Sequence, residues 1–198
     1  MAHPSSTQSL RDEFPALALT VGFASPAERD HLADLLLLWL EINRARNAAE
    51  SMIAAARITW WREALDNNRA EGVPLAERIL ASGRDLSSVS IMLARVVGIT
   101  LDAASTADND ICYAMGDMLA SMVNRGKGAS EIAQALMTLR SAMGGEDITP
   151  DRQTAVFTAK IPTPFKLMAW LSGRPQSLNY PESDPLLPLK MMVRAFRL

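Results

Sequence analysis

The sequence predicts an all-α protein, a single-domain bundle of about eight helices that spans residues 1–198. Two observations favour this class: apolar residues recur at helical spacing along most of the chain, and typical helix starts and stops separate these stretches. A third is that no run of alternating β-branched residues, which would indicate a strand, occurs. The length of 198 residues and the 48% hydrophobic content suit one globular domain.

The first long helix is predicted to begin at a capping box, Ser25-Pro26-Ala27-Glu28, with proline at the first helical position. Before it, the polar residues 1–11 are expected to be flexible. Because about 40 residues is long for one globular helix, we expect a break between Asn47 and Ser51. After this break the apolar residues at helical spacing are Met52, Ile53, Ala56, Trp60 and Leu65.

Cap residues, prolines at first helical positions and terminating glycines predict the remaining helices. Asp85 or Ser87 caps one of them, and Asp108 or Asn109 opens the next. Residues 174–184 are expected to form a loop before the C-terminal helix. The predicted helices cover residues 74–82, 87–104, 109–125, 132–143, 150–160, a segment from Thr163-Pro164, and a segment after Asp184-Pro185.

Composition and charge exclude several functional classes. Twenty basic and 22 acidic residues give a net charge of −2, so no global basic field favours nucleic acid as a partner. The polar start lacks the basic segment and long apolar run of a secretory signal, and the apolar run Leu35–Leu40 is too short to span a bilayer. The lone Cys112 fits a reducing compartment. We therefore expect a cytoplasmic protein that can also touch a membrane surface.

Metal and nucleophile signals are sparse. One cysteine and two histidines exclude a disulfide framework and a structural zinc site. His3 and His31 are predicted to be surface residues, and Cys112 an inert buried thiol. The chain has no phosphate-binding loop, nucleophile elbow or dinucleotide fingerprint, and no catalytic residue is predicted.

Asp30 and Asp34 are the candidate metal ligands. Their D-x-x-x-D spacing places both carboxylates on one helix face, where they could hold magnesium if a diphosphate supplied the other ligands. The alternative is that they serve the start of the helix, because acidic side chains are favoured near the positive end of the helix dipole.

Aromatic and basic residues gather around Trp60-Trp61-Arg62. Adjacent residues on a helix point about 100° apart, so at least one tryptophan should lie in the core. The other either covers a seam between helices or forms the wall of an apolar cavity. Arg44 and Arg57 lie nearby in the sequence; arginine binds planar anions through paired hydrogen bonds, although solvated ion pairs are the commoner arrangement.

The C-terminal stretch LPLKMMVRAFRL places Lys190, Arg194 and Arg197 on one helix face. Such a basic amphipathic helix either lies on an anionic membrane or docks on the protein's own core, and the sequence leaves both open. The apolar residues on its other faces are Leu189, Met192, Val193 and Phe196.

Several strings resemble the N-terminal half of the squalene/phytoene synthase family, closest to its divergent bacterial members and to the related mitochondrial complex I assembly factor. They are Phe23 to Pro26, Arg29, Glu41 to Arg46, and Arg57 to Leu65. The resemblance covers residues 12–70 closely and the rest loosely. It implies an isoprenoid-synthase-like fold and a candidate cavity or anion-binding site formed by Arg44, Arg57, Trp60, Trp61, Arg62, Tyr113, Gln134 and Arg140.

Departures from the family pattern bear directly on activity. Active members hold diphosphates through magnesium on two aspartate-rich motifs. The spacing around Trp39 places the first at Arg44 to Ala49, and the match of Gln134 and Arg140 places the second from Ser141 to Gly145. Neither stretch contains an aspartate. Asp30 precedes Arg44 by 14 residues, or about 20 Å of helix, so the pair lies too early to replace the first motif.

The resemblance therefore implies a non-catalytic relative that acts as a binding or assembly factor. Its expected partner is a protein of a membrane or respiratory complex, met at a membrane surface, and its expected cofactor is none. One alternative is a prenyl-diphosphate transferase that catalyses head-to-head condensation with magnesium. Another is a protein that carries an isoprenoid or lipid ligand. A length of 198 residues fits a shortened member of a longer family.

Overall fold

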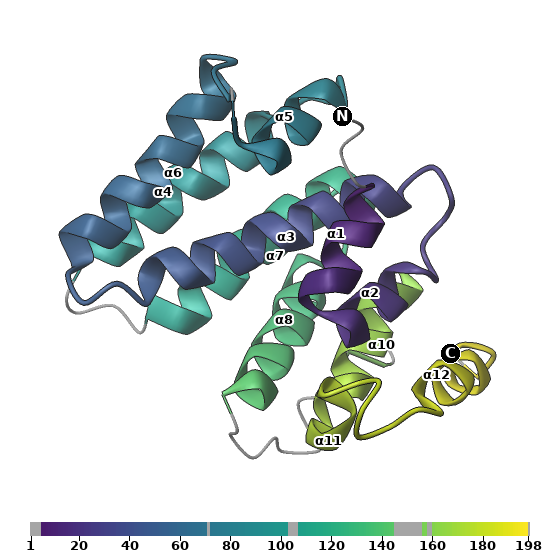
Figure 1. Ribbon diagram of the computed structural model, residues 1–198. Coiled ribbons are helices and arrows are strands. Elements are labelled where there is room, and N and C mark those ends of the chain that lie inside the picture. The colour runs from purple at the N-terminus through teal and green to yellow at the C-terminus, as the bar shows by residue number, and fades with distance from the viewer. Residues whose placement is uncertain (1–4, 71, 103–106, 145–155, 158–159, 198) are drawn as a thin grey trace.

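The computed structural model describes residues 5–70, 72–102, 107–144, 156–157 and 160–197 (Figure 1). Within these ranges the chain is 73% helical, has no strands and forms eleven helices, so the predicted all-α class is confirmed. Among the described residues, no helix is long and apolar enough to cross a bilayer. The helices are α1 (Ser6–Glu13), α2 (Pro15–Val21), α3 (Arg29–Arg46), α4 (Ser51–Asp66), α5 (Pro74–Ala81), α6 (Ser87–Leu101), α7 (Ala107–Val123), α8 (Ala129–Met143), α10 (Thr163–Ser172), α11 (Pro175–Leu178) and α12 (Leu187–Ala195).

Short helices account for the difference from the predicted eight. Residues 1–11 are predicted to be flexible, yet the described part of that segment belongs to α1. The Ser5 hydroxyl accepts a hydrogen bond from the Gln8 amide, which caps this helix, and Leu10 is fully buried. Similarly, the sequence predicts no helix over the residues of α2, and α11 lies inside the predicted loop 174–184. The predicted helix 150–160 falls mostly outside the described residues.

The predicted break in the long helical stretch is confirmed, because α3 ends at Arg46 and α4 begins at Ser51. The predicted capping box is wrong: the Ser25 carbonyl accepts from the Glu28 amide in a turn, and α3 begins at Arg29 without a side-chain cap. The Glu28 carboxylate pairs instead with the Arg84 guanidinium at 3.0 Å. In a capping box the Glu28 carboxylate would accept a hydrogen bond from the backbone amide of Ser25, but here it is engaged by Arg84.

Helix α3 lies across the middle of the molecule, with α1, α2, α4, α5 and α7 packed against it (Figure 1). Every residue from His31 to Leu40 is buried. A helix that is apolar on all sides lies in the interior of a protein. The unbroken apolar run Leu35–Leu40 gives α3 this character, and all six of its residues are buried. The helix therefore fixes the positions of the elements around it.

A series of helices, each packed on the next, extends the core. Helix α4 packs on α6, α6 on α7, α7 on α8, and α8 on α10. The contact of α7 with α8 depends on Gly116, where a Cβ atom would lie 2.6 Å from the Ala129 carbonyl oxygen and 2.7 Å from the Ala133 Cβ. The predicted buried position of Cys112, also on α7, is confirmed.

Two helical glycines give a matched test of this packing. Gly116→Ala should lower the free energy of unfolding by about 2 kcal/mol, because the added methyl group overpacks a backbone contact. Gly98→Ala on α6, where a Cβ would meet nothing within 4 Å, should raise it by up to about 1 kcal/mol through helix propensity alone. Urea unfolding of both variants measures the difference. Equal effects would mean that α7 and α8 do not approach closely at Gly116.

Candidate functional site

Four of the eight predicted site residues meet in one pocket. Arg44, Arg57, Trp60 and Trp61 line it together with Glu41 and Ala45, where the C-terminal part of α3 faces α4. The pocket has a volume of about 300 Å³, which is at the low end for a small-molecule site. It opens to the surface next to the exposed side of α4.

The two tryptophans have different environments. Trp61 is 7% exposed and belongs to the core, whereas Trp60 is 42% exposed. Their rings meet edge to face, with centroids 5.3 Å apart and planes at 78°. The prediction that at least one tryptophan lies in the core is confirmed, and Trp60 remains available at the mouth of the pocket.

The two arginines of the pocket are also unlike. Arg44 pairs through Nη2 with Glu13 Oε1 at 2.9 Å and through Nη1 with Glu41 Oε1 at 2.7 Å. The Glu13 side chain is 24% exposed, and its burial raises the pKa of the carboxyl even though Arg44 lowers it. Arg57 is exposed and makes no hydrogen bond or ion pair within the described residues. An anionic group entering the pocket would therefore meet one uncommitted guanidinium, at Arg57.

The other predicted residues do not line this pocket. Arg62 is half-buried on α4, Tyr113 is exposed on α7, and Gln134 and Arg140 are partly buried on α8. The structure thus separates the sequence-predicted set into the α3–α4 pocket and positions elsewhere.

The apolar stripe that the sequence predicts for α4 faces outward. Helix α4 buries Ala54, Ala55, Ile58, Trp61 and Leu65. Of the predicted stripe only Leu65 is buried; Met52 is 71% exposed and Ile53 46%. We call the exposed members the α4 outer face: Met52, Ile53, Ala56 and Trp60.

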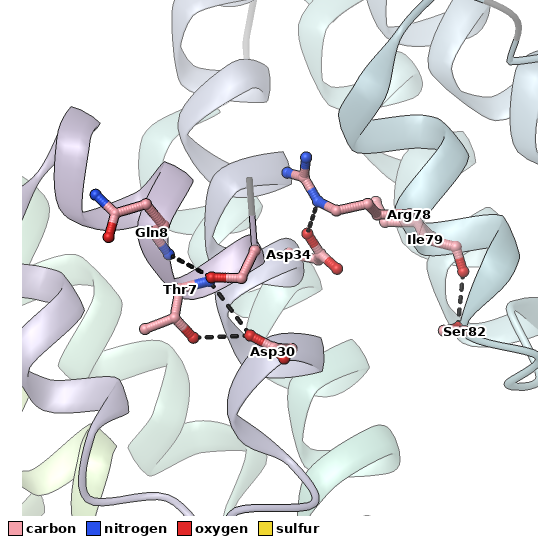
Figure 2. A network of polar contacts seen from close by, with 8 residues as sticks. Thr7, Gln8, Asp30, Asp34, Arg78, Ile79 and Ser82 are labelled. Carbon is pink, nitrogen blue, oxygen red and sulfur yellow. Dashed lines mark hydrogen bonds and ion pairs between the residues drawn. The ribbon is translucent and has the colours of Figure 1, made fainter. Parts of the chain in front are cut away.

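Asp30 and Asp34 are engaged in contacts within the protein (Figure 2). The Thr7 hydroxyl of α1 donates to Asp30 Oδ1 at 2.9 Å, and Arg78 Nε of α5 donates to Asp34 Oδ1 at 3.0 Å. Asp34 is buried, and this burial raises the pKa of its carboxyl despite hydrogen bonds from Arg78 and Ser6. The two carboxylates therefore join α3 to two different helices, α1 and α5.

No group of three or more histidine, cysteine, aspartate or glutamate side chains among the described residues is arranged to hold a metal ion. If Asp30 and Asp34 were to bind magnesium, they would have to exchange Thr7 and Arg78 for the metal. Such an exchange would break two of the polar contacts that hold α1 and α5 on α3.

His31 is not the surface residue that the sequence predicts. It is 6% exposed, and neither ring nitrogen has a hydrogen-bond partner among the described residues. Burial is the main cause that lowers its pKa to about 4, with the positive Arg84 adding to the effect. A signal was available in the sequence, since His31 stands four and seven residues before Leu35 and Leu38 on an apolar stripe.

Comparisons with protein-family models, curated proteins and solved structures found no match to this chain. The resemblance to the squalene/phytoene synthase family therefore rests on the sequence strings alone.

The buried ion pair has a matched exposed counterpart. Arg78→Ala should lower the free energy of unfolding by about 3 kcal/mol, because it leaves the buried Asp34 without its cation. Arg95→Ala breaks the exposed pair Arg95–Asp117, whose side chains are 47% and 61% exposed, and should change it by less than about 1 kcal/mol. Denaturant unfolding at neutral pH compares them. A similar small loss in both variants would show that Asp34 is not held by Arg78.

The lowered pKa of His31 predicts that acid destabilises the folded protein. Its folded-state pKa of about 4 lies below the unfolded value of 6.5, so protons favour the unfolded chain as the pH falls below 6.5. Between pH 7 and pH 5 the wild type should lose about 2 kcal/mol relative to His31→Leu. Unfolding of both proteins across this range isolates the histidine, since Asp34, Glu13 and Arg84 are common to both. Parallel pH profiles would contradict its burial in the neutral form.

Proposed function

We propose that this chain is a non-catalytic binding protein that acts as an assembly factor, on a scaffold of the squalene/phytoene synthase type. Its recognition surface is the α4 outer face together with the adjoining pocket of Arg44, Arg57 and Trp60. One observation carries the proposal: an apolar stripe at helical spacing faces solvent beside an arginine that has no partner within the described residues. We place the protein in the cytoplasm, with a partner that belongs to a membrane or respiratory complex.

Physical reasons favour a protein partner for this surface. Grouped exposed apolar side chains on a soluble protein are typical of interaction sites. Tryptophan and arginine are the residues that most often dominate the binding free energy of protein interfaces. A segment that offers an apolar side chain to Met52, Ile53 and Trp60, and a carboxylate to Arg57, would satisfy every part of the surface.

The state of the carboxylates supports a role without catalysis. Ionising an allylic diphosphate requires cations that neutralise the departing charge, and magnesium needs carboxylate oxygens to hold it. Asp30 and Asp34 already accept from Thr7 and Arg78, and Arg44 is neutralised by Glu13 and Glu41. These groups contribute to the fold and are not free to serve a leaving group.

The surface can be tested by placing a photoreactive amino acid at Ile53 and irradiating the protein in its native cells. We expect one discrete protein adduct, which Arg57→Glu should reduce at least tenfold by reversing the charge beside the site. The same photoreactive group at Ser130, an exposed position on α8, is the control and should give no such adduct. An adduct that forms equally from both positions, or that ignores Arg57→Glu, would contradict the proposal.

A turnover assay distinguishes the proposed binding protein from the prenyl-diphosphate transferase alternative. The purified chain should release no diphosphate from farnesyl diphosphate in the presence of magnesium. Turnover that Asp34→Asn abolishes, while the variant remains folded, would establish the transferase instead. An apolar ligand that co-purifies in stoichiometric amount, detected by mass spectrometry, would favour the isoprenoid- or lipid-carrying alternative.

A further inference from the structure

Helix α12 is apolar on two opposite sides. Leu187 and Met191 are fully buried where it packs on α10 and α2. Phe196 follows Leu187 by nine residues, which is two and a half helical turns and places it on the opposite side. We call that exposed side the α12 outer face: Leu186, Leu189, Met192, Val193 and Phe196, of which Phe196 is 86% exposed.

Packing against the rest of the protein accounts only for the buried side of α12. Arg194 stacks its guanidinium over the Phe157 ring at 4.7 Å, and Lys190 Nζ contacts Asp184 Oδ1 at 2.7 Å. These contacts hold α12 on the body of the protein with its outer face directed away from it. Figure 1 shows α12 at one edge of the molecule, so the outer face is not covered by another described helix.

The charged side chains of the segment that contains α12 are all basic, and the buried carboxylate just before it, Asp184, pairs with Lys190. Residues 185–198 contain Lys190, Arg194 and Arg197 and no acidic residue, although the whole chain has a net charge of −2. At about 100° per residue, Lys190 and Arg197 fall between the buried and the exposed apolar sides. Both are exposed, and the Lys190 side chain remains 51% exposed although its ammonium pairs with Asp184, whose side chain is 11% exposed.

We infer that the α12 outer face binds the surface of an anionic lipid bilayer. The five apolar side chains enter the boundary between headgroups and acyl chains, while Lys190 and Arg197 stay level with the lipid phosphates. The nine residues of α12 extend over about 14 Å, less than the roughly 30 Å of a bilayer core, so the helix lies in the plane of the interface. This surface uses different residues from the α4 outer face, so the inference stands apart from the proposed function.

The size of the face argues against a second protein chain as its main occupant. A helix about 14 Å long and about 10 Å wide presents a few hundred Å² on one side. A stable protein interface buries about 800 Å² on each partner. A bilayer requires no matched area, because its surface adapts to each inserted side chain and its anionic headgroups complement the basic flank.

Vesicle co-sedimentation of the full chain tests the inference. We expect binding to vesicles of phosphatidylcholine with phosphatidylglycerol, and at least tenfold weaker binding to phosphatidylcholine alone. The double variant Val193→Asp/Phe196→Asp should reduce binding to the anionic vesicles at least tenfold. The control Ile91→Asp/Leu101→Asp removes two exposed apolar side chains from α6 and should leave binding unchanged. Circular dichroism and thermal unfolding establish that both variants remain folded.

A labelled variant gives a second measurement that does not depend on a loss of binding. An environment-sensitive fluorophore at Phe196→Cys should shift to shorter wavelength when anionic vesicles are added, and the same label at Ile91→Cys should not. The single native cysteine, Cys112, is buried and does not interfere. Equal binding by the wild type and the α12 double variant would overturn the inference, as would the absence of any binding or shift. A concentration-dependent dimer that the α12 variant abolishes would assign the face to a second copy instead.

Discussion

The burial of α3 from His31 to Leu40 is the constraint on which the rest of the structure depends. A polar side chain that such a helix carries into the interior lowers stability unless it is hydrogen-bonded, as the ring nitrogens of His31, unpartnered among the described residues, illustrate. Asp34 meets this condition through Arg78 of α5, and Asp30, at the exposed edge, through Thr7 of α1. The same residues that attach the outer helices to α3 are therefore the ones that the sequence marks as metal candidates.

Helices α4 and α12 each carry apolar residues on more sides than packing uses. Helix α4 buries one apolar side against α3 and α6 and exposes another beside the pocket of Arg57 and Trp60. Helix α12 repeats this arrangement at the edge of the molecule with a basic flank. Both helices thus combine a buried apolar side, which joins the core, with an exposed apolar face.

The sequence predicts helix class and most helix ends well, because cap residues, prolines and glycines act locally; Pro74 and Gly83, for example, bound α5 correctly. The sequence does not predict which side of a helix is buried when two sides have similar apolar patterns, because contacts with other helices decide this. Helix α4 carries two stripes at helical spacing, one through Ile53 and Trp60 and one through Ile58 and Trp61. Periodicity shows that such stripes exist, but only the positions of α3 and α6 decide which is buried. The residues of the Asp34–Arg78 pair lie 44 positions apart in the sequence, so local sequence patterns cannot predict their contact.

The central position of α3 can be measured directly by native-state hydrogen exchange. If α3 is the element that every neighbour depends on, the amides of residues 35–42 should exchange only through global unfolding, with the largest opening free energy in the chain. The amides of α12 and of the exposed side of α4 should exchange through smaller local openings. Exchange of the α3 amides at a lower opening free energy than those of α8 would contradict the account, because α3 would then open while the rest of the core stayed folded.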